Sequence, residues 1–134
     1  MHNFSVTIEP RFYETDALGH INNASIAAWL EIVRMKFIAS LCTDGSYEAQ
    51  HWILASLQID FVAETFFGDD VIGRVAAVQV GNTSLSVFCE MHQCGKLTVK
   101  AKAVLVFMDD KTRTPVRVPE FLRKQLSESR QSLR

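Results

Sequence analysis

One short segment near the N-terminus carries residue types suited to hydrolytic chemistry. Residues 16–23 read D-A-L-G-H-I-N-N, and a long apolar stretch with helical spacing follows them. The first N–H groups of a helix lack partners within the helix and carry a partial positive charge, so they can bind an oxyanion. A carboxylate such as Asp16 beside that oxyanion site supplies the minimum that acyl transfer to water needs. A thioester suits this chemistry because its thiolate leaves easily, a thiol having a pKa of about 8.5.

The stretch after this segment predicts one long helix. Either Asn22 or Asn23 is a good N-cap, and the apolar spacing extends the helix to about Leu41. Further apolar residues occupy most of the remaining sides, which predicts a buried helix rather than a surface one. The main apolar stripe comprises Ile26, Leu30, Val33, Phe37 and Leu41.

The other elements predicted are mostly strands. Apolar and polar residues alternate in five segments, 4–10, 51–62, 70–80, 83–93 and 97–108. In 51–62 the odd positions are apolar: Ile53, Ala55, Leu57, Ile59 and Phe61. From Pro119 a short amphipathic helix follows, and its apolar residues are Phe121, Leu122 and Leu126.

Apolar matching also predicts how the strands pair, because a slip of one residue turns every side chain to the wrong face. The last hairpin is expected to pair Leu85 with Leu105, Val87 with Ala103, Cys89 with Ala101 and Met91 with Val99. The preceding hairpin is expected to pair Ala77 with Val87 and Val75 with Cys89. Both registers place Arg74, Glu90 and Lys100 in one exposed row on the face away from the helix.

The helix-facing side of the sheet is predicted to be rich in small residues, which let a helix lie close. They are Ala55, Gly73, Ala77, Ala101 and Ala103. The expected architecture is therefore α+β, with one long buried helix wrapped by a curved antiparallel sheet.

Length and composition limit which classes of protein this chain can belong to. The chain has 134 residues, which predicts one domain over 1–134, and its net charge of −1 argues against a nucleic-acid partner. The apolar runs are too short for a membrane span. Three cysteines without a C-x-x-C pair, and a first segment without the pattern of a secretory signal, predict a cytoplasmic protein. The histidines show no metal-ligand spacing, so no metal is expected.

The expected element order and two sequence blocks resemble the hot-dog acyl-CoA thioesterases of the 4-hydroxybenzoyl-CoA thioesterase family. The blocks are R-F-Y-E-T-D-A-L-G-H-I-N-N at 11–23 and W-L-E-I-V-R at 29–34, with weaker matches at 59–61 and 67–69. The family often has an aromatic residue where Ile26 stands and a proline where Glu64 stands. The first departure bears on acyl preference, and the second is expected to affect only a loop.

The resemblance implies a role for each residue of the segment. Asp16 becomes the catalytic carboxylate, either as general base on water or as nucleophile. The backbone N–H of Asn23 falls where the family polarises the thioester carbonyl. Gly19 lets the loop pass close to the substrate, and His20 and Asn22 line or brace the pocket.

Structural roles compete with these assignments. Asp16 could serve only as a turn or capping residue, Asn22 and Asn23 only as caps, and His20 only as a satisfied structural histidine. One related hot-dog class uses a helix carboxylate, which makes Glu31 a minor candidate. Glu31 lies eight residues past Asn23, about 12 Å along the helix, so it is expected to pair with Arg34 instead.

The resemblance implies hydrolysis of an acyl-CoA, with a fatty or aromatic acyl group, to free acid and CoA. No cofactor is expected, since coenzyme A is part of the substrate, and an acyl-carrier protein in place of CoA stays open. The family builds its site across a dimer, so a homodimer or homotetramer is expected. A hot-dog hydratase or dehydratase is an alternative, but that class has D-x-N-P-x-H, whereas Asp16 and His20 here read D-x-x-x-H. A non-catalytic thioester-binding module is the other alternative, and Asp16 argues against it.

Overall fold

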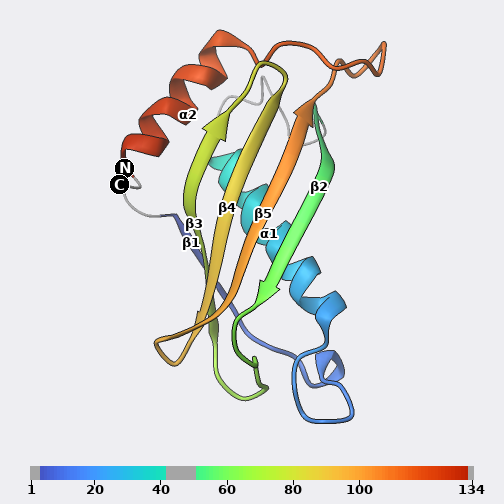
Figure 1. The fold of residues 1–134 in the computed structure, drawn as a ribbon, viewed down its shortest axis with the longest axis vertical. Coiled ribbons are helices and arrows are strands. Elements are labelled where there is room, and N and C mark those ends of the chain that lie inside the picture. Colours follow the sequence, from blue (N-terminus) through green and yellow to red (C-terminus); the bar gives the residue numbers. More distant parts are fainter. Residues whose placement is uncertain (1–3, 42–50, 133–134) are drawn as a thin grey trace.

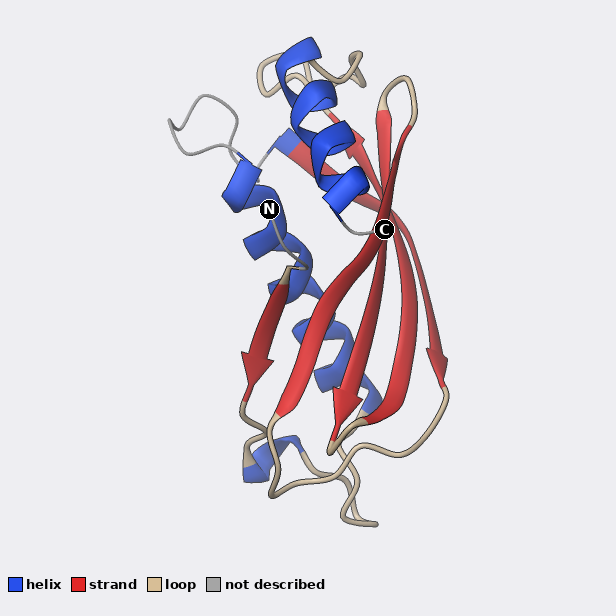
Figure 2. Cartoon of the chain, turned by 90° about the vertical axis from the view of Figure 1, so that its left-hand side faces the viewer, coloured by secondary structure: helices blue, strands red, loops and turns tan. Residues whose placement is uncertain are grey.

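Five antiparallel strands form one curved sheet across a long helix (Figures 1 and 2). The computed structural model describes residues 4–41 and 51–132. The sheet has the strand order β1-β3-β4-β5-β2. In chain order the elements are β1 (Ser5–Ile8), a short 3-10 helix η1 (Phe12–Glu14), α1 (Asn23–Leu41), β2 (Trp52–Phe61), β3 (Val71–Val80), β4 (Ser84–Gln93), β5 (Lys96–Phe107) and α2 (Glu120–Ser132).

The elements confirm the α+β hot-dog arrangement expected from the sequence. α1 begins at Asn23 and ends at Leu41, as predicted, and β2 to β5 each agree with their predicted bounds to within one residue. β1 is shorter than the predicted 4–10, because its pairing ends where Ile8 meets Val71, the first residue of β3. In Figure 1, α1 crosses behind the sheet and α2 lies beside β3.

The core lies between α1 and the sheet. The predicted stripe of α1 is buried throughout, and Val33 and Phe37 are completely covered. A Cβ atom built on Gly73 would lie 2.6 Å from Cγ2 of Val33, so only glycine lets the helix approach β3 this closely. The predicted role of small residues is therefore confirmed at this position.

The predicted register of the last hairpin is confirmed as far as Met91 and Val99, beyond which it shifts by one residue toward the turn. β4 and β5 pair Leu85 with Leu105, Val87 with Ala103, Cys89 with Ala101 and Met91 with Val99. The charged row forms in the predicted order, because Arg74 opposes Glu90 and Glu90 opposes Lys100, but it is less exposed than predicted. Arg74 Nη2 lies 3.2 Å from the Glu90 carboxylate, and both side chains are half-buried while Lys100 is exposed. Asp60 of β2 extends the row on the other side of Lys100.

Two further register shifts, each a β-bulge, correct the predicted alternation of buried and exposed residues. Val75 pairs with Cys89 as expected, but the register then shifts, so Ala77 opposes Phe88 rather than Val87 and is exposed instead of facing the helix. A second shift between Leu54 and Ser56 breaks the odd-numbered apolar face predicted for 51–62. A bulge adds one residue to one strand and reverses the faces beyond it. Alternation alone could not reveal either bulge.

α1 is less completely buried than predicted, whereas α2 is amphipathic as predicted. Ile32, on the side of α1 away from the sheet, is 42% exposed, so α1 is not covered on all sides by the described chain. In α2, Leu122 and Leu126 join the core as expected, but Phe121 is 48% exposed. A single sheet layer covers only one side of α1, which leaves Ile32 exposed.

One end of the molecule gathers the elements that form the candidate site. α1 begins and β2 ends at this end of the molecule, where the segment before α1 and the β2–β3 connection also lie (Figures 1 and 2). The backbone N–H of Ile21 donates to Thr65 O at 2.8 Å and joins these two segments. The fold thus places the motif of residues 16–23 against the chain that leaves β2.

Candidate active site

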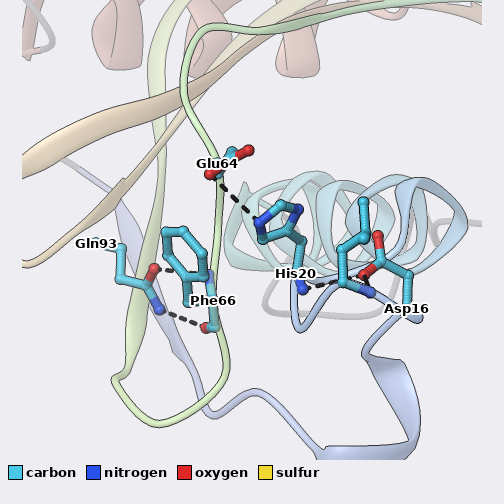
Figure 3. Close-up of polar contacts among 6 residues, drawn as sticks. Asp16, His20, Glu64, Phe66 and Gln93 are labelled. Atoms are coloured by element: carbon cyan, nitrogen blue, oxygen red, sulfur yellow. Dashed lines mark hydrogen bonds and ion pairs between the residues drawn. The ribbon is translucent and has the colours of Figure 1, made fainter.

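Asp16 lies in a tight loop that holds its own carboxylate (Figure 3). One carboxylate oxygen, Oδ1, accepts the backbone N–H groups of Leu18 at 2.8 Å and of His20 at 3.1 Å. The backbone N–H of Asp16 in turn donates to His20 O at 2.7 Å. The loop therefore fixes the direction of an otherwise exposed carboxylate.

Gly19 allows this loop to turn. Its φ of +83° lies in the left-handed region that favours glycine, and its N–H donates to Asp16 O at 3.2 Å. A Cβ atom at Gly19 would meet no heavy atom of the described chain within 4 Å. The backbone conformation, rather than crowding within the chain, explains this glycine.

Asn22 is the N-cap of α1. Its Oδ1 accepts the N–H of Ser25 at 2.7 Å, and its backbone oxygen accepts the N–H of Ile26 at 3.3 Å. Asn23 is therefore the first residue of the helix. Within residues 4–41 and 51–132, the N–H groups of Asn23 and Ala24 form no hydrogen bond, which leaves two donors for a ligand at the positive end of the helix.

Glu14 ties the loop to the helix, a role that the sequence reading missed. Its carboxylate accepts the N–H of Arg11 at 2.7 Å and the indole N–H of Trp29 at 2.8 Å. Its backbone oxygen accepts both the N–H and the side-chain amide of Asn22. The partners are up to fifteen residues away in the chain, so no local pattern reveals them.

A cavity of about 310 Å³ brings three of the predicted residues together, namely Asp16, His20 and Asn23. Gly19 and Asn22 do not line it, so they act on the loop and on the helix start. The rest of the lining comes from the start of α1 and from the chain leaving β2. These residues are Ile21, Ile26, Phe61, Val62, Ala63, Glu64 and Thr65.

His20 lies between Asp16 and Glu64 (Figure 3). Its Nε2 is 3.3 Å from Glu64 Oε2, and its ring meets the Phe66 ring edge-on, with centroids 5.0 Å apart. Glu64 therefore contributes a second carboxylate to the cavity, which corrects the expectation that this departure from the family pattern affects only a loop. The contact joins residues 44 positions apart, which no sequence spacing foretells.

Glu31 lies outside the cavity. Its carboxylate is 3.6 Å from Arg34 Nη2, which confirms the predicted pair one turn apart on α1. Burial lowers the pKa of Arg34, and the negative charge of Glu31 partly offsets this effect. The geometry therefore assigns Glu31 to Arg34, while Asp16 is the carboxylate beside the helix start.

The described residues were also compared with the requirements of a metal site and of a membrane-spanning helix. Nowhere in residues 4–41 and 51–132 do three or more His, Cys, Asp or Glu side chains gather closely enough to hold a metal ion. In the same residues, neither α1 nor α2 is long and apolar enough to cross a membrane.

The chain is similar to known proteins that are named as thioesterases. The chain is 27% identical, over 128 residues, to a chloroplastic acyl-acyl carrier protein thioesterase from Arabidopsis thaliana. That match covers 90% of this chain but only 65% of the relative, so the chain spans about two-thirds of the relative's length.

Solved structures share the fold over nearly the whole chain. A predicted thioesterase from Bacillus stearothermophilus is 31% identical with a TM-score of 0.85, and the match covers 94% of this chain and 95% of that one. A thioesterase from Thermus thermophilus, solved with coenzyme A and Zn, is 27% identical with a TM-score of 0.83, covering 92% and 91%. The model of the thioesterase-like superfamily matches residues 10–126. The chain therefore belongs to the thioesterase-like superfamily.

Proposed function

We propose that this protein hydrolyses an acyl-CoA thioester to the free acid and CoA in the cavity at the start of α1. One observation carries the proposal: the oriented carboxylate of Asp16 shares a cavity with Asn23, whose N–H has no partner in the described chain. Membership of the thioesterase-like superfamily supports it. The coenzyme A bound by the Thermus thermophilus relative supports CoA as the leaving group.

The helix start would bind the carbonyl oxygen of the thioester. The N–H groups of Asn23 and Ala24 are free of other hydrogen bonds in the described chain, and the helix dipole adds positive character there. Negative charge develops on this oxygen as the carbonyl carbon becomes tetrahedral. Fixed donors stabilise that charge without having to reorganise during the reaction.

Asp16 would supply the catalytic carboxylate. Its Oδ1 already accepts two N–H groups, so its other carboxylate oxygen is the one available for reaction. As a general base it takes a proton from water while the water oxygen attacks the carbonyl carbon. The C–S bond then breaks, and the CoA thiolate leaves and takes up a proton. As a nucleophile it instead attacks the carbonyl carbon, the C–S bond breaks with loss of the CoA thiolate, and water hydrolyses the resulting mixed anhydride to the free acid.

The acyl group is proposed to be fatty or aromatic. Ile26, Phe61 and Val62 give the cavity apolar walls, whereas its charged groups include the carboxylates of Asp16 and Glu64. A negatively charged acyl end would meet these carboxylates and be disfavoured. The Arabidopsis thaliana relative is named for acyl-acyl carrier protein. A carrier-protein thioester therefore belongs in the substrate test.

A second copy of the chain is proposed to complete the site. β2 is an edge strand, and its side chains are poorly covered, with Leu54 41% and Phe61 47% exposed. Proteins usually cover such an edge, and isologous pairing of β2 with its symmetry mate would do so. Because Phe61 also lines the cavity, the pairing would bring the partner chain next to the candidate site.

Thiol release from a panel of thioesters tests the proposal. The panel comprises acyl-CoAs of increasing chain length, aromatic acyl-CoAs, a dicarboxylic acyl-CoA and one acyl-acyl carrier protein. We expect release of free CoA from fatty or aromatic members and little from the dicarboxylic member. Hydration of an enoyl-CoA without thiol release would instead establish a hydratase. Binding of thioesters without any reaction would establish a binding module.

A further inference from the structure

Gln93 is a polar residue at a position where β4 otherwise buries apolar side chains. Alternate residues of β4 are buried, and the first four of them are apolar, namely Leu85, Val87, Cys89 and Met91. Gln93, the last residue of the strand, continues this series and is only 7% exposed. A buried amide is costly unless its polar atoms are hydrogen-bonded, so its partners should explain its presence there.

The amide of Gln93 holds the β2–β3 connection at two points. Its Oε1 accepts the N–H of Phe66 at 3.0 Å, and its Nε2 donates to Phe66 O at 2.8 Å and to Asp69 O at 3.0 Å. Figure 3 shows the two bonds to Phe66. Both amide hydrogens and the amide oxygen therefore have partners, and all of these partners are backbone groups of one connection. Gln93 thus fixes the Phe66 backbone relative to β4.

Phe66 carries this constraint to the loop before α1. Its backbone forms an isolated antiparallel bridge with His20, and the neighbouring Thr65 O accepts the N–H of Ile21 at 2.8 Å. The rings of Phe66 and His20 also meet edge-on. Figure 3 shows Phe66 between Gln93 on one side and His20 on the other. The backbone of His20 is therefore held against a segment that Gln93 holds in turn.

His20 is also the residue that orients Asp16. Its N–H donates to Asp16 Oδ1 at 3.1 Å, and its backbone oxygen accepts the N–H of Asp16 at 2.7 Å. A movement of the His20 backbone would therefore turn the carboxylate within the cavity. Three successive contacts thus join β4 to this carboxylate: Gln93 with Phe66, Phe66 with His20, and His20 with Asp16.

We propose that Gln93 is a positioning residue for Asp16, an inference that rests on the proposed thioester hydrolysis. Gln93 does not line the cavity that contains Asp16, so it acts through the backbones of Phe66 and His20. A misplacement of about 1 Å in a reacting group can lower a rate roughly 10²-fold. Loss of the Gln93 hydrogen bonds should therefore reduce kcat more than it weakens substrate binding.

Gln93→Met tests this role, because it keeps a side chain of similar length and removes the amide. We expect kcat for thiol release, assayed well below the Tm of the variant, to fall roughly 10- to 100-fold, with KM changed less than about threefold. Tm should fall as well, because buried backbone groups of Phe66 and Asp69 lose their partner.

Arg123 provides a matched control for the loss of stability. Its Nη1 donates to Gly81 O at 2.8 Å, so it too binds the backbone of a connection, but at the β3–β4 turn and away from the cavity. Arg123→Met should lower Tm and leave kcat unchanged. A loss of kcat in Arg123→Met as large as that in Gln93→Met would show that reduced stability, rather than positioning, lowers the rate.

Gln93→Glu adds a pH profile that applies even where Gln93→Met is too unstable to assay. A neutral carboxyl can accept the N–H of Phe66 and donate its one hydrogen to a carbonyl oxygen, whereas a carboxylate can only accept and would face Phe66 O and Asp69 O. Burial and these two oxygens should raise the pKa of the introduced carboxyl. The ratio of kcat in Gln93→Glu to wild-type kcat should therefore rise at least about threefold between about pH 8 and about pH 6. Division by the wild-type value cancels the titration of Asp16.

Three results would overturn the inference. They are a wild-type kcat in folded Gln93→Met, an effect of Gln93→Met confined to KM, and a ratio for Gln93→Glu that does not change with pH. Asp16→Asn distinguishes the two levels of the argument. If Asp16→Asn is inactive while Gln93→Met is fully active, only the role of Gln93 fails. If Asp16→Asn keeps full activity, the proposed function fails as well.

Discussion

Asp16 owes its orientation to its own loop rather than to distant parts of the chain. Both N–H groups that bind Oδ1 come from residues no more than four positions away. An asparagine could accept the same two hydrogen bonds through its amide oxygen. Asp16→Asn therefore removes the negative charge while it preserves the loop, whereas alanine would remove both.

The start of α1 allows a matched pair of variants that tests the oxyanion donor. Asn23 is the first helical residue, where proline is tolerated because the N–H has no partner within the helix. Asn23→Pro removes this donor, so we expect kcat to fall roughly 10²–10³-fold. Asn23→Ala keeps the N–H and should retain kcat to within a few-fold. Equal kcat values in both variants, with unchanged circular dichroism, would refute a role for this N–H.

Cys89 gives a prediction about stability and pH. Burial raises the pKa of its thiol from 9.0 to about 12, although the nearby positive charge of Arg34 acts in the opposite direction. The folded state thus holds this proton more tightly than the unfolded chain does. The stability that results is complete below pH 9 and is lost as the pH rises toward 12.

Urea unfolding of wild type and Cys89→Ala on both sides of pH 9 measures this effect. Above that pH, the wild type should lose ~1.4 kcal/mol of unfolding free energy per pH unit more than the variant. Parallel pH profiles for the two proteins would show that the thiol does not titrate in this way.

At the scale of elements, the contact between α1 and β3 depends on one missing side chain. A Cβ atom at Gly73 would lie 2.6 Å from Val33 Cγ2, well inside van der Waals contact. We expect Gly73→Ala to cost about 1–3 kcal/mol of unfolding free energy through overpacking. The cost should be smaller in a Val33→Ala background, where the obstructing methyl is absent. A double-mutant cycle measures the coupling, and strictly additive effects would contradict the packing argument.

The elements also show which structural features a sequence can reveal. Apolar matching identified the β4–β5 register and the charged row, because both depend on a period of two. It missed the shift at Ala76 because consecutive alanines fit either face of a sheet. It likewise could not place Glu64 or Thr65 in the cavity, since the β2–β3 connection reaches α1 only through tertiary contacts such as Ile21 with Thr65.

The candidate site likewise contains residues that the sequence motif predicts and residues that only tertiary contacts bring there. Asp16, His20 and Asn23 lie within one short motif, so their proximity follows from the motif and from the start of a helix. Glu14, by contrast, ties the loop to α1 through its hydrogen bond with Trp29, which lies fifteen residues away in the chain. Residues whose roles depend on such long-range contacts leave no periodic signal in the sequence.

At the scale of the whole molecule, the uncovered β2 edge predicts assembly. Sedimentation at micromolar concentration should show a dimer or a larger even-numbered species and no monomer, because pairing of β2 would cover Leu54 and Phe61. Dilution below the dissociation range should reduce specific activity if the partner chain helps to form the site. A fully active monomer would exclude both the dimer and the shared site.

We assign hydrolysis to the carboxylate of Asp16 in the loop and not to that of Glu31 on the helix. The most direct test is kcat for thiol release from the best thioester in Asp16→Asn, with Glu31→Gln as the matched control. Both substitutions replace a carboxylate by its amide, but only Asp16 lines the cavity. We predict a loss of at least about 10²–10⁴-fold for Asp16→Asn and near wild-type turnover for Glu31→Gln. Loss of turnover in Glu31→Gln with full turnover in Asp16→Asn would contradict the account.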